Sequence, residues 1–207
     1  MAAGYPVVYA KGYDTKEDHV DEELVAEAVR AAKEAEVAVI FAGLPDAFES
    51  EGYDRQHMRL PECQNYLIRE ICKVNENVVV VLHNVSPVEM PWADQVKGIL
   101  EVYLGGQAVG GATVDVLYGK VNPSGHLAET FPLKLQDNPS YLYYVGEGNK
   151  VEYREGVFVG YRYYDAKEMP VAFPFGYGLS YTTFAYSNLT LDRNNVADED
   201  TVTVTVD

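Results

Sequence analysis

Val37-Ala38-Val39-Ile40-Phe41-Ala42-Gly43 is an uninterrupted apolar run, and Glu49-Ser50-Glu51-Gly52-Tyr53-Asp54-Arg55 follows it after a short interval. A short apolar run that ends in glycine is typical of a strand in a covered parallel sheet. Such sheets hold their ligands just beyond the carboxyl ends of the strands. The sequence therefore predicts that the carboxylates, the arginine and the tyrosine of the second stretch lie where the chemistry of this fold takes place.

Strand and helix signals alternate on both sides of this stretch. Val20, Leu24, Ala28 and Ala31 recur at helical spacing, and a second helix is expected to begin at Pro61. We expect strands at residues 7–10, 37–42, 78–82 and 98–103, and helices that begin near residues 20, 61 and 107. This alternation predicts an α/β fold, a mostly parallel sheet flanked by helices in an α/β sandwich.

The pattern changes after Gly119. Residues 119–144 are rich in Asn, Pro, Gly and Ser and predict loops with little regular structure. Residues 151–186 are crowded with aromatic residues and glycines, which favours short strands and turns over a core. Residues 201–206 alternate Thr and Val and predict a strand, so we expect a chain cut inside a strand.

Composition excludes several classes of function. The chain has 207 residues and a formal net charge of -16, which repels nucleic acid and anionic membrane surfaces. It lacks the roughly 20 consecutive apolar residues that a membrane span needs. Residues 1–5 show no signal peptide, and this is compatible with a cytoplasmic location.

The histidines and cysteines show no metal-site pattern. Cys63 and Cys72 lie nine residues apart in one predicted helix, and His57, His83 and His126 show no ligand spacing to them or to one another. We expect the two thiols to line the core. The sequence predicts neither a metal nor a cofactor.

Nine short motifs occur in an order that resembles the carboxyl-terminal α/β-sandwich domain of glycoside hydrolase family 3, the β-glucosidases and their relatives. They are Phe41 to Pro45, Glu49 to Arg55, Leu60-Pro61, Ser86 to Trp92, Gly105 to Gln107, Asp115 to Gly119, Asn122 to Gly125, Thr130 to Pro132 and Phe173 to Tyr181. Val85 departs from the pattern, because relatives often have glycine there.

The resemblance implies an active site that is shared between this domain and another domain of a longer protein. In this family a (β/α)8 barrel supplies most of the sugar pocket and an aspartate nucleophile, and the α/β domain leans its carboxylate loop over the mouth of the barrel. Residues 1–190 would form that α/β domain without the barrel. Residues 191–207 would form a linker and the first strand of a truncated fibronectin type III-like domain.

Hydrolysis of a glycoside with retention needs two carboxyl groups roughly 5 Å apart, one as nucleophile and one as proton donor. The resemblance implies that Glu51 is the general acid/base, and Glu49 on the same loop remains an alternative. Phe48 is a candidate to stack on a sugar, whereas Asp54 and Arg55 are expected to hold the loop. The implied partners are a β-linked glucoside or oligosaccharide and the barrel domain of the same protein.

Two other functions remain open from the sequence. The aromatic half of the chain would also suit a non-catalytic module that binds carbohydrate or stabilises a partner. A flavodoxin-like nucleotide binder would share the sheet topology alone, and a fold does not fix a function. If the chain is instead part of a family 3 hydrolase, as the resemblance implies, the isolated chain is expected to be inactive.

Overall fold

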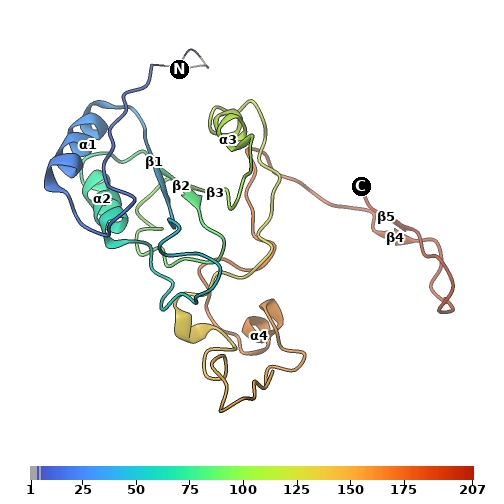
Figure 1. Cartoon of the computed structure of the whole chain (residues 1–207). Coiled ribbons are helices and arrows are strands. Elements are labelled where there is room, and N and C mark those ends of the chain that lie inside the picture. Colours follow the sequence, from blue (N-terminus) through green and yellow to red (C-terminus); the bar gives the residue numbers. More distant parts are fainter. Residues whose placement is uncertain (1–3, 5) are drawn as a thin grey trace.

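The computed structural model describes residues 4 and 6–207, so most of the segment searched for a signal peptide lies outside the described residues. Its centre is a parallel sheet in the order β1-β2-β3 (Figure 1). The strands are β1 (Ala38–Gly43), β2 (Val78–His83) and β3 (Gly98–Glu101). Ala38 is paired with Val78 and Val79 with Gly98. The predicted α/β fold with a parallel sheet is confirmed.

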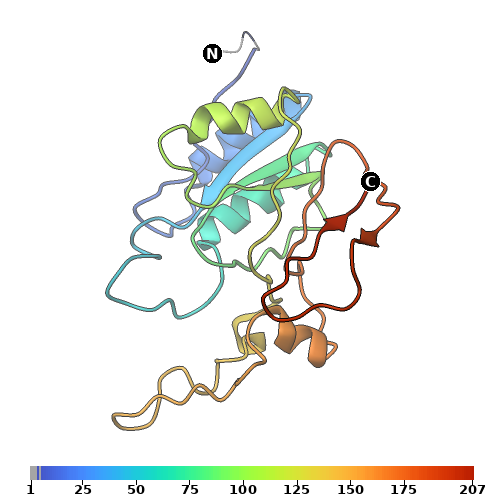
Figure 2. The same cartoon turned by 90° about the vertical axis from the view of Figure 1, so that its right-hand side faces the viewer.

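Helices lie on both sides of this sheet. The helix α1 (Glu22–Glu34) packs against α2 (Glu62–Cys72) on one face, and α3 (Val109–Leu117) lies on the other side (Figures 1 and 2). None of the helices in the described part of the chain is long and apolar enough to cross a bilayer.

Aspartate side chains accept hydrogen bonds from backbone N–H groups at the beginnings of α1 and α2. The side chain of Asp21 caps α1 by accepting hydrogen bonds from the backbone N–H groups of Glu23 and Leu24. Asp18 accepts a hydrogen bond from the backbone N–H of Cys63 in the first turn of α2. The buried face of α1 consists of Val25, Ala28 and Ala32. This face is turned slightly from the predicted one.

The core lies between α1, α2 and the central strand β2. Four residues of β2 are fully buried, and three of them pack in one cluster with Leu67, Ile68 and Ile71 of α2. Trp92 is fully buried beside them, and its Nε1–H donates a hydrogen bond to Oδ1 of Asn65 at 2.9 Å. Trp92 is therefore a packing anchor of the core.

The strand expected at residues 7–10 is absent, because this part of the described chain is extended and exposed. Val8 is 79% exposed and Tyr9 81% exposed. The outer edge of β1 is instead occupied by side chains: Tyr13 donates its hydroxyl to the carbonyl of Phe41, and the amide of Gln64 bonds both backbone groups of Gly43. Such side-chain contacts pair the backbone groups of an edge strand without a further strand beside it.

The first strand is also less covered than the apolar run suggests. Val39 is 41% exposed and Phe41 52% exposed, while the other four residues of β1 are buried. Because β1 is an edge strand, helices cover only the face that Ala38, Ile40 and Ala42 present to α1 and α2.

The chain after α3 is mostly irregular, as predicted for residues 119–144. A 3₁₀ turn, η1, spans Leu135–Asp137. In the aromatic segment the structure has an unpredicted helix, α4 (Tyr161–Ala166), which buries Tyr164. It follows Gly160, whose φ of 56° turns the chain into the helix in a backbone region that favours glycine.

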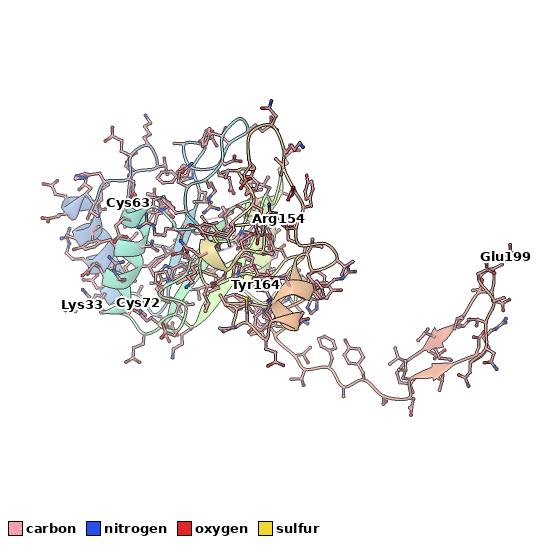
Figure 3. All side chains as sticks on the ribbon, turned by 90° about the horizontal axis from the view of Figure 1, so that it is seen from below. Lys33, Cys63, Cys72, Arg154, Tyr164 and Glu199 are labelled. Carbon is pink, nitrogen blue, oxygen red and sulfur yellow. The ribbon has the colours of Figure 1, made fainter. Side chains whose placement is uncertain are left out.

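A thin hairpin ends the chain and extends away from the rest of the molecule (Figure 3). Its strands β4 (Thr190–Leu191) and β5 (Val204–Thr205) pair antiparallel, and Ser187 pairs with Asp207 through both backbone groups. The regular strand is therefore shorter than the predicted residues 201–206. The division of the chain near residue 190 stays a prediction.

We expect Trp92→Phe to lower the free energy of unfolding by about 1–3 kcal/mol, because the substitution leaves the buried Oδ1 of Asn65 unpaired. Urea denaturation followed by far-ultraviolet circular dichroism measures this loss. Tyr153→Phe is the control, because Tyr153 is 89% exposed and should change stability by less than about 0.5 kcal/mol. Equal stability of Trp92→Phe and the wild type would refute the anchoring role.

Candidate active site

The loops that follow β1, β2 and β3 meet at the carboxyl edge of the sheet, because the three strands run in the same direction. Glu49 lies on the first loop, Ser86 on the second, and Glu101 is the last residue of β3. The candidate active site is built from these three connections.

Glu49 is bound to the loop after β2. Its Oε2 accepts a hydrogen bond from Val85 N–H at 2.7 Å, and its Oε1 accepts from Ser86 N–H at 3.1 Å and from Ser86 Oγ at 2.7 Å. Its side chain is only 14% exposed. Structural donors thus occupy both oxygens of this carboxylate.

Arg55 approaches the same serine from the other end of the loop. Its Nη1 donates to Ser86 Oγ at 2.8 Å and to the carbonyl of Pro87 at 3.3 Å, and it lies 3.7 Å from Oε1 of Glu49. Burial lowers the pKa of Arg55, and the carboxylates of Glu49 and Glu89 oppose this change. A guanidinium group stays charged under these conditions because its ordinary pKa is so high.

Glu51 lies on the exposed turn between these two anchors. Its side chain makes no hydrogen bond or ion pair with the described residues. Gly52 follows it with a φ of 94°, a backbone conformation that side chains rarely allow. The carboxylate of Glu51 is therefore presented to solvent on a tight turn.

The remaining predicted residues help to shape this loop. The carboxylate of Asp54 accepts a hydrogen bond from the hydroxyl of Tyr144 at 2.8 Å, which ties the loop to the segment after η1. Tyr53 closes the turn by donating its hydroxyl to the carbonyl of Asp46 at 2.7 Å. Phe48 is half-buried near the start of the loop, where its N–H donates to the carbonyl of Pro45.

Glu101 is a further carboxyl group at this edge. Its oxygens accept hydrogen bonds from Tyr103 N–H at 3.0 Å and from Nδ2 of Asn84 at 3.3 Å. Burial raises the pKa of Glu101 to about 7, against the opposing effect of these two bonds. The negative charges of Glu129 and Glu49 raise it further.

A cavity of about 560 Å³ opens between this edge and the aromatic segment. Arg55 and Ser86 line it from the sheet side, and Tyr161, Tyr164 and Phe175 line it from the other. Burial also raises the pKa of Glu129, which borders the same cavity. The rings of Tyr161 and Phe175 stack at 4.9 Å between centroids.

Ser86 and Glu101 are the site residues that the sequence did not single out. Ser86 belongs to a quoted motif, but no spacing rule links it to a loop more than thirty positions earlier. Glu101 carries a detectable signal, since it is the one charged residue of the strand predicted at residues 98–103, and ligands of such sheets bind beyond the strand ends.

His57 lines the same cavity as Arg55 and Ser86, whereas the two cysteines lie on α2. His83 stacks on Phe41, and His126 donates from Nδ1 to the carbonyl of Gly176. Both cysteines are free thiols on α2 (Figure 3), where burial and the nearby Asp18 raise the pKa of Cys63 to about 12. The described residues contain no group of three or more His, Cys, Asp or Glu side chains suited to a metal ion.

The buried carboxyl of Glu101 should make stability depend on pH. Its pKa of about 7 in the folded chain lies above the ordinary value of 4.5, so the stability that the protonated form contributes is present below about pH 4.5 and is lost as the pH rises through 7. When the pH rises from 5 to 8, the free energy of unfolding of the wild type should therefore fall by on the order of 2 kcal/mol more than that of Glu101→Gln. Urea unfolding at the two pH values measures this, and equal pH dependence of both proteins would contradict it.

Three known proteins match 90% or more of this chain. The chain is 60% identical over 200 residues to thermostable beta-glucosidase B of Acetivibrio thermocellus, covering 97% of this chain and 26% of that protein. The crystal structure of Bifidobacterium adolescentis GH3 beta-glucosidase matches 99% of this chain and 30% of its own, with a TM-score of 0.92 and 47% identity. That of beta-glucosidase from Kluyveromyces marxianus in complex with glucose covers 90% of this chain and 22% of its own, with a TM-score of 0.81 and 43% identity.

The chain thus spans between about a fifth and a third of the length of these relatives. Residues 4–181 match the model of the glycosyl hydrolase family 3 C-terminal domain. This match covers most of the chain. The chain therefore belongs to the glycosyl hydrolase family 3 C-terminal domain family.

Proposed function

We propose that this chain is the α/β domain of a longer retaining β-glucosidase and that Glu51 is the general acid/base of its active site. The observation that carries the proposal is the contrast between the two glutamates of one loop. Glu49 is held by Val85 and Ser86, whereas Glu51 is exposed on the turn and free of structural partners among the described residues.

This contrast suits the chemistry of the reaction. In glycosylation the acid must place its proton on the leaving oxygen, so its carboxyl must reach a substrate without competing bonds. In deglycosylation the same group, now a carboxylate, takes a proton from the attacking water. Glu51 can face a second domain in both steps, while Glu49 is already saturated by N–H and O–H donors.

The second carboxyl group of the pair would come from a barrel domain in the same protein. Relatives named beta-glucosidases are three to five times the length of this chain, which leaves room for such a domain. The substrate would be a β-linked glucoside or oligosaccharide. Asp54 and Arg55 would hold the loop, and Phe48 would border the sugar.

Glu51→Gln in the full-length protein should lower kcat/KM for cellobiose by about 10²–10⁴-fold, because a poor leaving group needs the proton. For 2,4-dinitrophenyl β-glucoside the loss in kcat/KM should be far smaller, since this leaving group departs as an anion. The basic limb of the pH profile for cellobiose should disappear with the acid.

Azide distinguishes the two glutamates. Added azide should restore turnover of the dinitrophenyl glucoside by Glu51→Gln and yield a glucosyl azide, because azide replaces the water that lacks its base. Glu49→Gln keeps the base and should form no such product. Glucosyl azide from Glu49→Gln alone would assign the acid/base to Glu49 instead.

The chain alone, without a barrel, should hydrolyse no 4-nitrophenyl β-glucoside above the rate in buffer. Calorimetric titration with glucose and cellobiose should show no saturable binding, because most of the sugar pocket would lie elsewhere. Clear saturation without hydrolysis would favour the alternative function, a non-catalytic carbohydrate-binding module.

A further inference from the structure

The two ends of the carboxylate loop converge on one serine of the neighbouring loop. Glu49 begins the segment and Arg55 ends it, and both bind Ser86. These contacts join residues 37 and 31 positions apart in the sequence. The five residues between the anchors, 50–54, include Glu51.

The hydroxyl of Ser86 is used in both directions. It donates to Oε1 of Glu49 at 2.7 Å and accepts from Nη1 of Arg55 at 2.8 Å. A hydroxyl has one proton to donate, so this pattern gives it one defined orientation. Bonds to charged partners are also stronger than bonds between neutral groups. One oxygen atom therefore connects an anion and a cation that flank Glu51 on either side.

The backbone of Ser86 is in turn bound by the side chain of Asn84. Nδ2 of Asn84 donates to the carbonyl of Ser86 at 3.0 Å and to Oε2 of Glu101 at 3.3 Å. Asn84 is 1% exposed, so this support lies in the interior. The serine is thus tied through Asn84 to the end of β3.

Glu51 depends on this support because its own side chain has no partner among the described residues. Its position is set by the backbone of the turn and hence by the anchors at both ends. Proton transfer requires heavy atoms within about 2.6–3.2 Å of each other. A displacement of about 1 Å at a reacting group can cost 100-fold in rate.

We propose that Ser86 is a positioning residue for the proton donor: its hydroxyl joins Glu49 to Arg55 and so fixes the turn that presents Glu51. This inference rests on the proposed acid/base role of Glu51. Ser86 itself does not touch the reacting atoms; it acts through the loop.

Ser86→Ala in the full-length protein tests this role. It should lower kcat/KM for cellobiose by about 10- to 100-fold and change kcat/KM for 2,4-dinitrophenyl β-glucoside by less than about 2-fold. The basic limb of the pH profile for cellobiose should remain, because Glu51 is still present. In Glu51→Gln that limb is lost.

Ser86→Thr is the matched control. It keeps the hydroxyl, and the added methyl group has room because Ser86 borders the cavity. Activity on cellobiose should stay within about 3-fold of the wild type. Failure of threonine to restore activity would overturn the hydroxyl-based role.

Two other results would overturn the inference while leaving the proposed function intact. One is an equal loss on both substrates by Ser86→Ala, which indicates a general loss of folded enzyme. The other is full activity of Ser86→Ala on cellobiose. If Glu51→Gln itself loses no more on cellobiose than on the dinitrophenyl glucoside, the proposed function fails instead.

Hydrogen exchange of the 207-residue chain gives a readout without catalysis. The N–H groups of Val85 and Ser86 donate to Glu49, so Ser86→Ala, which frees the loop on one side, should speed their exchange. Exchange in β2 should not change. Ser86→Thr should exchange at the rate of the wild type. Unaltered protection of both N–H groups in Ser86→Ala would count against the positioning role of Ser86.

Discussion

Parallel pairing of β1, β2 and β3 is the constraint on which the rest of the structure depends. In a parallel ladder every strand ends at the same edge, so residues that are far apart in sequence are brought to one place. Glu49, Ser86 and Glu101 follow or end three different strands, and they meet only because these strands share a direction. Loss of this register would separate the carboxylates even if every helix still formed.

The regular elements around the sheet could be predicted from local sequence because their signals are local. Asp21 caps a helix that begins one residue later, and the run of valines at 78–81 forms the most buried strand. The strand predicted at residues 7–10 was wrong, and the reason lies in contacts between distant residues. A strand needs a neighbour, and at β1 that position is taken by the hydroxyl of Tyr13 and the amide of Gln64.

The site was predictable in part. The position of Glu51 on a loop beyond a strand follows from the sequence, and so does the order of the motifs around it. The distinction between Glu49 and Glu51 does not, because both have the same side chain on one turn. It depends on which of them meets the N–H groups of Val85 and Ser86, and such a contact appears only when two loops are placed side by side. Contacts between distant loops produce no periodic pattern in the sequence from which they could be predicted.

Trp92 gives this arrangement an optical property. It is the single tryptophan of the chain, it is fully buried, and it lies six positions after Ser86 on the same connection between β2 and β3. An indole held in the core emits at shorter wavelength than one in water. The fluorescence of the chain therefore reports the packing of the connection that carries Ser86, and loosening of that connection can be followed by light emission alone.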